Sequence, residues 1–299
     1  MGKKISGSMK AQRTITDVIV HIFLVCVAII WLIPFVWLVA HSFRGGVDRG
    51  QYAATFFPTE WTLDNYTRLF TDTSTIDFPR MFLNTLFVSI CSCAISTFIV
   101  LSVSYCVSRV DWKMRKPYLN MALVINLFPA FMSMVAIYFL LKAIGLTEGS
   151  MIPLALIIVY SAGAGTQFYV MKGYMDTIPK ALDEAAYIDG ATRWETFTKI
   201  TLPLCRPMVV YQVITSFMAP WMDFIFAKII CGTKTQYYTV SIGLYSLLTS
   251  KEYVSSWFTR FCAGAVLHST GREYLVPISI LYIYTQRFYQ EAMAGGVKG

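Results

Sequence analysis

The sequence predicts an all-α, polytopic membrane protein with six transmembrane helices and one cytoplasmic helix-turn-helix loop. Composition is the first reason. Of the 299 residues, 56% are hydrophobic and 14% are charged, and the mean hydropathy of +0.55 is too high for an ordinary soluble domain. The apolar residues also gather in runs of about 20, the length that a helix needs to cross about 30 Å of hydrocarbon.

The N-terminal part is expected to hold a tail, a first span and an external loop. Residues 1–17 form a basic cytoplasmic tail, and the membrane domain occupies residues 18–289. The first span is predicted over residues 18–40, with Pro34 as a candidate kink. Residues 44–80 are polar and mixed in charge, which is typical of a loop outside the membrane.

Three further spans are predicted before the polar loop, over residues 81–108, 117–141 and 151–171. The middle one contains Asn126 and Pro129, which in a membrane helix indicate a kink whose freed polar groups are satisfied locally. Asn126 is also a candidate for lining a substrate pathway.

A fifth span is predicted over residues 208–230, and it carries Trp221 and Asp223. A carboxylate at membrane depth is costly and by default indicates function, so we expect both residues in a pathway or in a wet outer vestibule. Residues 231–256 then predict a second external loop, with alternating apolar and polar residues over 238–244.

The sixth span is expected within residues 261–288, followed by a cytoplasmic tail over residues 290–299. The polar patch His268–Glu273 interrupts this span. Two interpretations stay open: Arg272 and Glu273 pair inside one long helix, or two short helices meet at Gly271.

Residues 173–207 are a polar island between the fourth and fifth spans. Pro179 suits a first helical position, because its missing N–H has no helical partner there, and the helix is expected to run to Ile188. Gly190 favours the left-handed conformation that ends a helix. A second short helix is expected to follow and to end near Leu202-Pro203.

The spacing of this island is more specific than its composition. Three residues separate Glu184-Ala185-Ala186 from Gly190, nine separate Gly190 from Ile200, and one separates Ile200 from Leu202-Pro203. This spacing resembles the EAA signature of membrane subunits of binding-protein-dependent ABC importers. Flanking residues extend the likeness to the carbohydrate (maltose and maltodextrin) branch of that family: Tyr174, Asp176–Pro179, Leu182-Asp183, Ile188–Ala191 and Pro207.

The resemblance implies a subunit that works in a complex. Its partners are a second homologous permease, a homodimeric ABC ATPase and an external substrate-binding protein, with ATP and Mg bound by the ATPase and no cofactor bound by this chain. The loop is implied to be a coupling helix docked in a cleft of the ATPase. The implied coupling residues are Glu184, Ala185, Ala186, Asp189, Gly190, Ile200, Leu202 and Pro203.

Two further contacts follow from the same resemblance. The C-terminal tail, with Gly295, Gly296 and Lys298, is implied to contact the ATPase. The loop over residues 231–256 is implied to contact the binding protein through Tyr238, Thr239, Gly243 and Tyr245, a simple connector being the alternative.

The distribution of charge indicates orientation. Most of the 25 Lys and Arg residues fall in the N-terminal tail, in the turn after the second span and around the polar island, which predicts that these parts are cytoplasmic. The net charge of +8 then reflects topology and contact with anionic lipid rather than nucleic-acid binding.

We therefore predict a non-catalytic permease subunit in the cytoplasmic membrane of a prokaryote that moves a sugar, in the first place a malto-oligosaccharide. The chain has no phosphate loop, no HExxH and no GxSxG, so neither a catalytic residue nor a metal site is predicted. Alternatives are a permease for another carbohydrate, a receptor or scaffold, and an ion-coupled secondary transporter. The last would use Asp223 or the patch with His268, Arg272 and Glu273.

Overall fold

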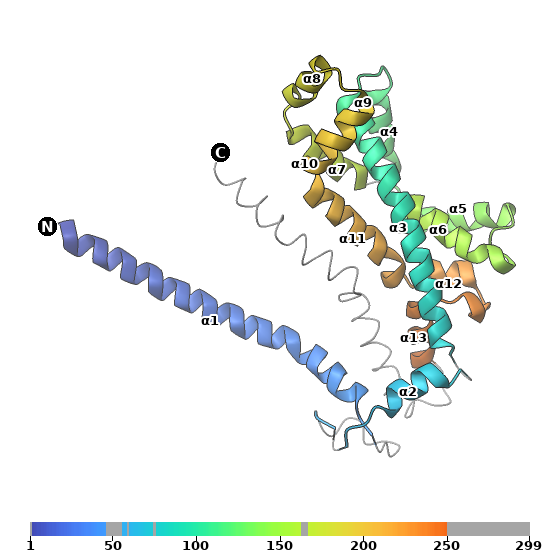
Figure 1. The fold of residues 1–299 in the computed structure, drawn as a ribbon. Coiled ribbons are helices and arrows are strands. Elements are labelled where there is room, and N and C mark those ends of the chain that lie inside the picture. The colour runs from blue at the N-terminus through green and yellow to red at the C-terminus, as the bar shows by residue number, and fades with distance from the viewer. Residues whose placement is uncertain (1, 46–55, 59, 74–75, 163–166, 250–299) are drawn as a thin grey trace. The chain divides into compact units, whose positions relative to one another are not determined.

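The computed structural model describes residues 2–45, 56–58, 60–73, 76–162 and 167–249. Within these residues the chain is helical and contains no β-strand beyond one isolated bridge (Figure 1). Three described segments are long and apolar enough to cross a membrane, over residues 15–42, 78–109 and 149–177. The all-α class is confirmed. The count of six spans stays a prediction, because the expected sixth span and the patch His268–Glu273 lie outside the described residues.

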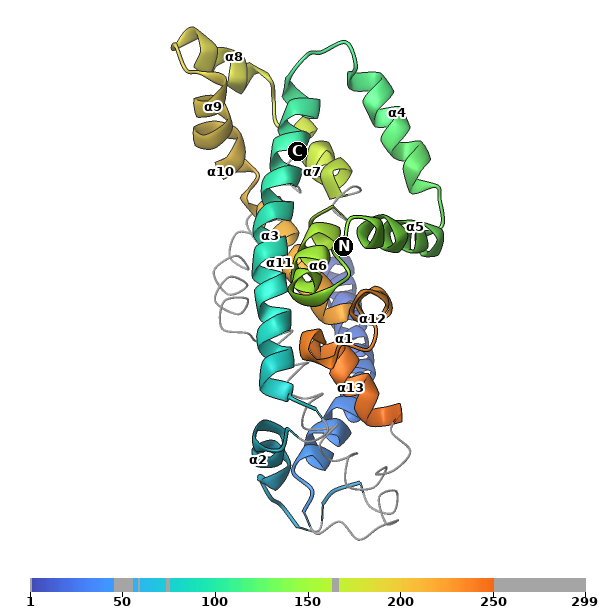
Figure 2. The same cartoon turned by 90° about the vertical axis from the view of Figure 1, so that its right-hand side faces the viewer.

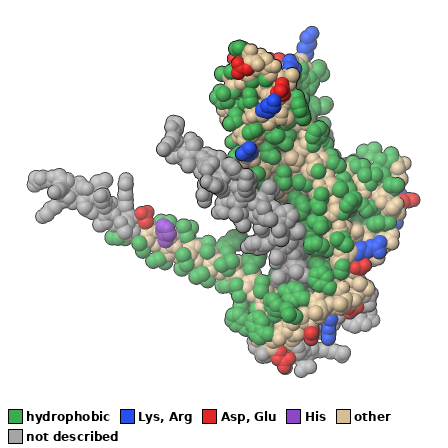
Figure 3. Space-filling model, in the orientation of Figure 1, with side chains coloured by type: hydrophobic (Ala, Val, Ile, Leu, Met, Phe, Trp, Pro, Cys, Tyr) green, Lys and Arg blue, Asp and Glu red, His purple; other side chains and the backbone are tan. Residues whose placement is uncertain are grey.

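The chain divides into two compact units, of which the first contains α1 (Gly2–Ser42) and α2 (Asp64–Thr71). The predicted tail and first span form one continuous helix, and Figure 3 shows hydrophobic side chains along its described surface. Asn65 Nδ2 donates to the carbonyls of Ser42 (3.0 Å) and Arg44 (2.9 Å), which ties α2 to the end of α1. This amide therefore fixes the described helix of the predicted first external loop to the end of the first span.

The second unit is built around α3 (Phe78–Arg109), against which α6 (Ile152–Ala162), α7 (Gln167–Thr177) and α11 (Arg206–Met222) pack (Figure 2). Small hydroxylated side chains line these contacts and let the helix backbones approach closely. The Ser104 hydroxyl donates to the Phe168 carbonyl at 3.1 Å, for example, and the Ser96 and Ser216 hydroxyls lie 3.1 Å apart.

The predicted third span is two helices, so the expected kink is a complete break. Helix α4 (Arg115–Asn126) ends before Leu127, and α5 (Ala130–Ala143) begins after Pro129 in a different direction (Figure 2). Pro129 has no N–H to continue the helix. Asn126 Nδ2 donates to the Ala122 carbonyl at 2.8 Å, which is the local polar satisfaction that the sequence predicts.

The fifth predicted span is also divided, and the fourth is described on both sides of residues 163–166. A short 3-10 turn, η1 (Gly149–Met151), leads into α6, and α7 follows after residues 163–166. The fifth consists of α11 and α12 (Ile225–Cys231), which are separated at Asp223.

The second external loop contains helices where a loop is predicted, namely η4 (Thr235–Tyr237) and α13 (Val240–Thr249). Gly243 allows α13 to pack this closely, because a Cβ atom there would lie 2.2 Å from Met81 Sδ. The apolar and polar residues that alternate over 238–244 are therefore almost all buried in a packed segment, with only Ser241 half-buried.

Candidate functional site

The predicted helix-turn-helix is present and begins two residues later than expected. Helix α8 (Ala181–Ile188) carries Asp183 and Glu184 in its first turn, where negative charge complements the helix dipole. Gly190 has a φ of +83°, and Ala191 N–H donates to the Ala186 carbonyl at 2.9 Å. This arrangement is a Schellman motif, so the glycine makes the predicted turn.

The second half of the hairpin starts with a capping box. The Glu195 N–H donates to Thr192 Oγ1 at 3.2 Å, and the Thr192 N–H donates to Glu195 Oε2 at 3.0 Å. The Thr192 N–H, followed by the Lys199 ammonium, lowers the pKa of Glu195 to about 2. This carboxylate is therefore ionised at any physiological pH.

The second helix of the hairpin extends past its predicted end. The chain passes from α9 (Arg193–Glu195) through a π-helical stretch, η3 (Thr196–Thr201), into α10 (Leu202–Leu204). Pro203 does not stop it, because a proline is accommodated in the first turn of a helical segment. The break falls at Cys205, where the helix axis turns by 83° into α11.

The motif residues divide by exposure. Glu184, Ala185, Asp189 and Gly190 are exposed, Ala186 is buried, and Ile200, Leu202 and Pro203 are half-buried. Sequence reasoning assigned no role to the apolar side chains beside them. Ile188 is 86% exposed and Trp194 is 65% exposed, although Figure 3 shows charged side chains of both signs at this end of the unit. These two side chains are candidates for contact with another protein, because exposed apolar groups beside charged ones are costly to leave in water.

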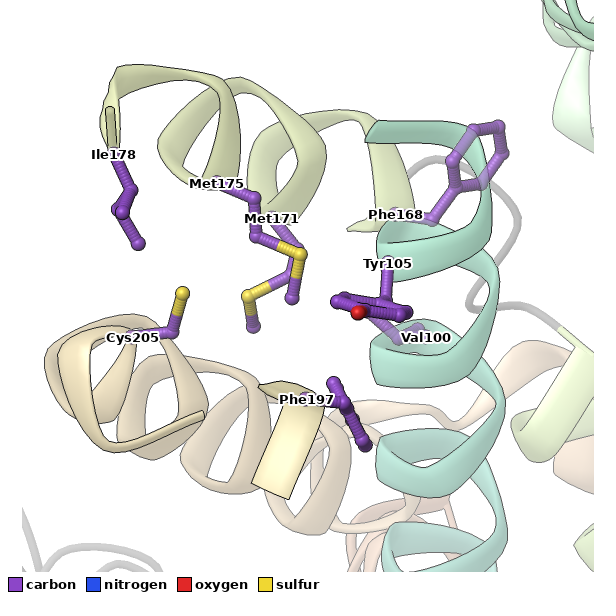
Figure 4. Packing of buried hydrophobic residues seen from close by; sticks show 8 residues of the cluster. All are labelled: Val100, Tyr105, Phe168, Met171, Met175, Ile178, Phe197 and Cys205. Atoms are coloured by element: carbon purple, nitrogen blue, oxygen red, sulfur yellow. The ribbon is translucent and has the colours of Figure 1, made fainter. Parts of the chain in front are cut away.

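A buried cluster holds the hairpin against the spans (Figure 4). Val100 and Tyr105 come from α3, three residues come from α7 and one from directly after it, and Phe197 and Cys205 come from the hairpin. The rings of Tyr105 and Phe197 lie 4.7 Å apart, and the Tyr105 hydroxyl donates to the Arg193 carbonyl at 3.2 Å. The residues of α7 are Phe168, Met171 and Met175, and Ile178 follows directly after the helix. The hairpin is therefore packed onto the helical body.

A buried ion pair also joins the hairpin to α3, and sequence reasoning missed it. Arg109 Nε lies 3.2 Å from Asp183 Oδ2, with side-chain exposures of 3% and 8%. Arg109 Nη2 donates to the carbonyls of Met175 and Ile178, both at 2.9 Å. The sequence placed Arg109 in a basic turn and Asp183 on a polar helix face, and nothing in its local pattern pairs two residues so far apart in the chain.

Two of the three predicted pathway residues line one cavity. Its volume is about 520 Å³, and Asn126 and Asp223 lie in its wall with Ser96, Tyr160, Gln167 and Ser216. The Tyr160 hydroxyl donates to Asp223 Oδ2 at 2.8 Å, and Asp223 also accepts the N–H groups of Phe226 and Ala227. Asp223 thus caps α12 while facing the cavity.

Trp221 does not line this cavity. Its side chain is fully buried and packs against the rings of Phe82, with centroids 5.3 Å apart, and Phe217, at 6.3 Å. Its prediction as a vestibule residue is corrected to a packing role.

The predicted binding-protein contacts are mostly buried within the subunit. Tyr238, Thr239 and Gly243 are inaccessible, because α13 and its preceding turn pack on α3. Tyr245 is 48% exposed. A direct contact is compatible with Tyr245 alone, and the other three assignments are corrected. The tail residues Gly295, Gly296 and Lys298 lie outside the described part of the chain.

Apolar helices long enough to cross a membrane, with a polar helix-turn-helix between two of the predicted spans, define a class: the polytopic membrane proteins. Residues 102–270 match the family model described as "Binding-protein-dependent transport system inner membrane component". The chain belongs to this family, whose members are non-catalytic permease subunits of ABC importers located in the inner membrane.

Individual relatives cover nearly the whole chain. The galactooligosaccharides transport system permease protein GanQ of Bacillus subtilis is 31% identical over 98% of this chain and 99% of its own length. The maltodextrin transport system permease protein MalD of Streptococcus pneumoniae is 30% identical over 98% and 100%. A bacterial ABC transporter for import of the polysaccharide alginate shares the fold, with a TM-score of 0.74 at 18% identity over 92% of this chain and 97% of that one.

Proposed function

We propose that this subunit imports an oligosaccharide of the galacto-oligosaccharide or maltodextrin class across the cytoplasmic membrane, driven by a separate homodimeric ATPase. The exposed face of the hairpin, with Glu184, Ala185 and Ile188, carries this proposal. An acidic side chain next to small and apolar ones fits a cleft with a basic or polar group on a partner protein. The remaining partners are a second homologous permease and an external substrate-binding protein.

The mechanism is a switch between two states. When ATP and Mg are bound in the ATPase subunits, closure of their dimer moves the docked hairpin, and the spans change from inward-open to outward-open. The hairpin transmits this motion because it is packed onto α3 and α7 rather than hanging from flexible loops. Tighter binding of ATP to the closed state of the ATPase then favours one state of the membrane domain.

The cavity beside Asn126 and Asp223 is the proposed part of the sugar pathway in this subunit. Sugars present hydroxyl groups and apolar ring faces, and its wall supplies polar side chains together with the rings of Phe128 and Phe226. A volume of about 520 Å³ is within the range of small-molecule sites. At the outer end, Tyr245 is the proposed contact with the binding protein. The N-terminus is proposed to be cytoplasmic, as is the C-terminal tail that contacts the ATPase.

The proposal is tested with Glu184→Lys in the complete transporter. We expect the charge reversal to lower sugar uptake at least tenfold while the permease still inserts, because Glu184 is exposed and supports no internal contact of the hairpin. Glu148→Lys is the matched control, since Glu148 is also exposed but lies between the third and fourth predicted spans, which places it on the side of the membrane opposite to the hairpin. Normal uptake by Glu184→Lys would refute the coupling assignment. Uptake driven by an ion gradient without any ATPase would favour the secondary transporter.

A further inference from the structure

The ion pair between Arg109 and Asp183 stands at the meeting point of three helices. Arg109 is the last residue of α3, and Asp183 lies in the first turn of α8. Arg109 also binds two carbonyls at the end of α7, that of Met175 in its last turn and that of Ile178 directly after it. Among the described residues, no other ion pair joins α8 to a span. Because both side chains are buried, water and salt screen this pair only weakly.

Helix dipoles hold the pair in place. The guanidinium lies at the C-terminal end of α7, where the last carbonyls are negative, and the carboxylate lies at the N-terminal end of α8, where the first N–H groups are positive. The segment between these helices is short and contains Pro179, which prevents a continuous helix. Arg109 therefore bridges the junction between α7 and α8, where the backbone hydrogen bonding of one continuous helix is interrupted.

Neighbouring residues of α8 face opposite ways. Glu184 is exposed on the side proposed to meet the ATPase, whereas Asp183 is buried against the end of α3. A displacement of the exposed face of α8 therefore also displaces the buried Asp183 carboxylate and the arginine that it contacts.

Helix α3 extends from Arg109, beside the hairpin, to the middle of the second unit. Its 32 residues form one α-helix whose only proline, Pro79, lies in the first turn. Its length is about 48 Å at 1.5 Å per residue, more than the thickness of the hydrocarbon core. Ser96, in the middle of this helix, lines the cavity that holds Asn126 and Asp223. One straight helix thus connects the ion pair to the wall of the proposed pathway.

We propose that Arg109 is a positioning residue for coupling: through Asp183 it makes α8 and α3 move as one body, so that motion of the ATPase reaches the cavity. This inference rests on the proposed coupling role of the hairpin. Without the pair, the hairpin stays bound to the ATPase but pivots at Pro179, and ATP is hydrolysed without a matching movement of the spans.

The test compares sugar transported per ATP hydrolysed, using the purified complex with its binding protein in liposomes. Asp183→Asn is the first variant, because it is nearly isosteric and removes only the charge. Arg109→Gln and the double variant follow. We expect each single variant to lower the ratio at least fivefold, and the double variant to be no worse than the worse single one, because all three lack the same pair. Arg115→Gln, which breaks the exposed pair with Asp111, is the matched control.

Three outcomes would overturn the inference. The first is an unchanged ratio of transport to hydrolysis in Asp183→Asn, and the second is a double variant in which the effects of the single variants multiply. The third is failure of Asp183→Asn to assemble, because the ion pair would then only stabilise the structure. Cross-linking of the hairpin to the ATPase through Ile188→Cys distinguishes failure of the ion-pair inference from failure of the proposed function. A cross-link in both the wild-type background and Asp183→Asn, together with an unchanged ratio, rejects the ion-pair link alone. Absence of the cross-link in the wild-type background rejects the proposed function.

Discussion

Gly190 shows how a single residue determines the shape of the hairpin. Its φ of +83° lies in the left-handed region, where a side chain costs roughly 1–2 kcal/mol. A Cβ at this position would meet no atom within 4 Å, so the cost of a substitution comes from the backbone and not from a clash.

We therefore expect Gly190→Ala to destabilise the turn by about 1 kcal/mol and to speed up hydrogen exchange of the amides that close it, Gly190 and Ala191. Gly173→Ala is the control, because Gly173 also has open space around its Cβ position but no positive φ. Exchange measured by mass spectrometry on the assembled complex checks this. Equal exchange in the two variants would contradict the assigned turn.

Thr192 is the second residue on which the hairpin depends. Thr192→Ala removes a cap and should cost on the order of 1 kcal/mol of local helix stability. Its neighbour Glu195 has a lowered pKa of about 2, so this carboxylate stabilises the hairpin fully above the ordinary glutamate pKa, and the contribution is lost as the pH falls toward 2.

The measurement for Thr192→Ala is hydrogen exchange of the amides around Glu195 at neutral pH, where faster exchange is expected. Thr198→Ala is the matched control, because the Thr198 hydroxyl donates to the Trp194 carbonyl inside the helix and caps nothing. A larger effect of Thr198→Ala than of Thr192→Ala would show that the capping box is not what starts this helix.

Individual residues of the site were predictable only where local chemistry determines them. The turn at Gly190 was predicted correctly because a turn is local, and the coupling role of Glu184 stays a prediction from the motif spacing. Arg109 and Asp183 were not paired, and Trp221 was assigned to a vestibule, because burial and long-range contacts depend on how α3, α7 and α11 pack.

At the scale of elements, α13 packs against α3 through the close approach of Gly243 to Met81. Gly243→Leu should destabilise the subunit by about 1–3 kcal/mol, because the added side chain overfills a packed contact. Thermal unfolding of the purified complex checks this, and Met81→Ala in the same chain should restore part of the loss. Gly173→Leu, which meets open space, is the control. An unfolding temperature unchanged by Gly243→Leu would contradict the packing.

The apolar runs predicted where helices lie better than where they break. The first two spans were predicted to within three residues at most boundaries, since long uninterrupted apolar runs leave little choice. A kink near Asn126 and Pro129 was predicted from local chemistry, although not the complete break between α4 and α5. The break at Asp223 and the helix α13 were not predicted.

At the scale of the whole molecule, the family and the role of a permease subunit were predictable, because the EAA spacing is specific and the apolar composition requires a bilayer. The number of spans, the orientation and the partners remain predictions. The central claim is that the hairpin over residues 173–207 binds the ATPase on the cytoplasmic side. Its tip presents Ile188, which is 86% exposed, and Ile144 offers a matched exposed isoleucine, 68% exposed, in a predicted external turn.

The most direct measurement is cysteine cross-linking in intact membranes that contain the complete transporter, with the native cysteines replaced. A bifunctional thiol reagent should join Ile188→Cys to a cysteine introduced in the ATPase cleft, in proportion to assembled complex, and should give no such product with Ile144→Cys. No product from Ile188→Cys, or labelling of that residue by a membrane-impermeant reagent added outside, would contradict the account.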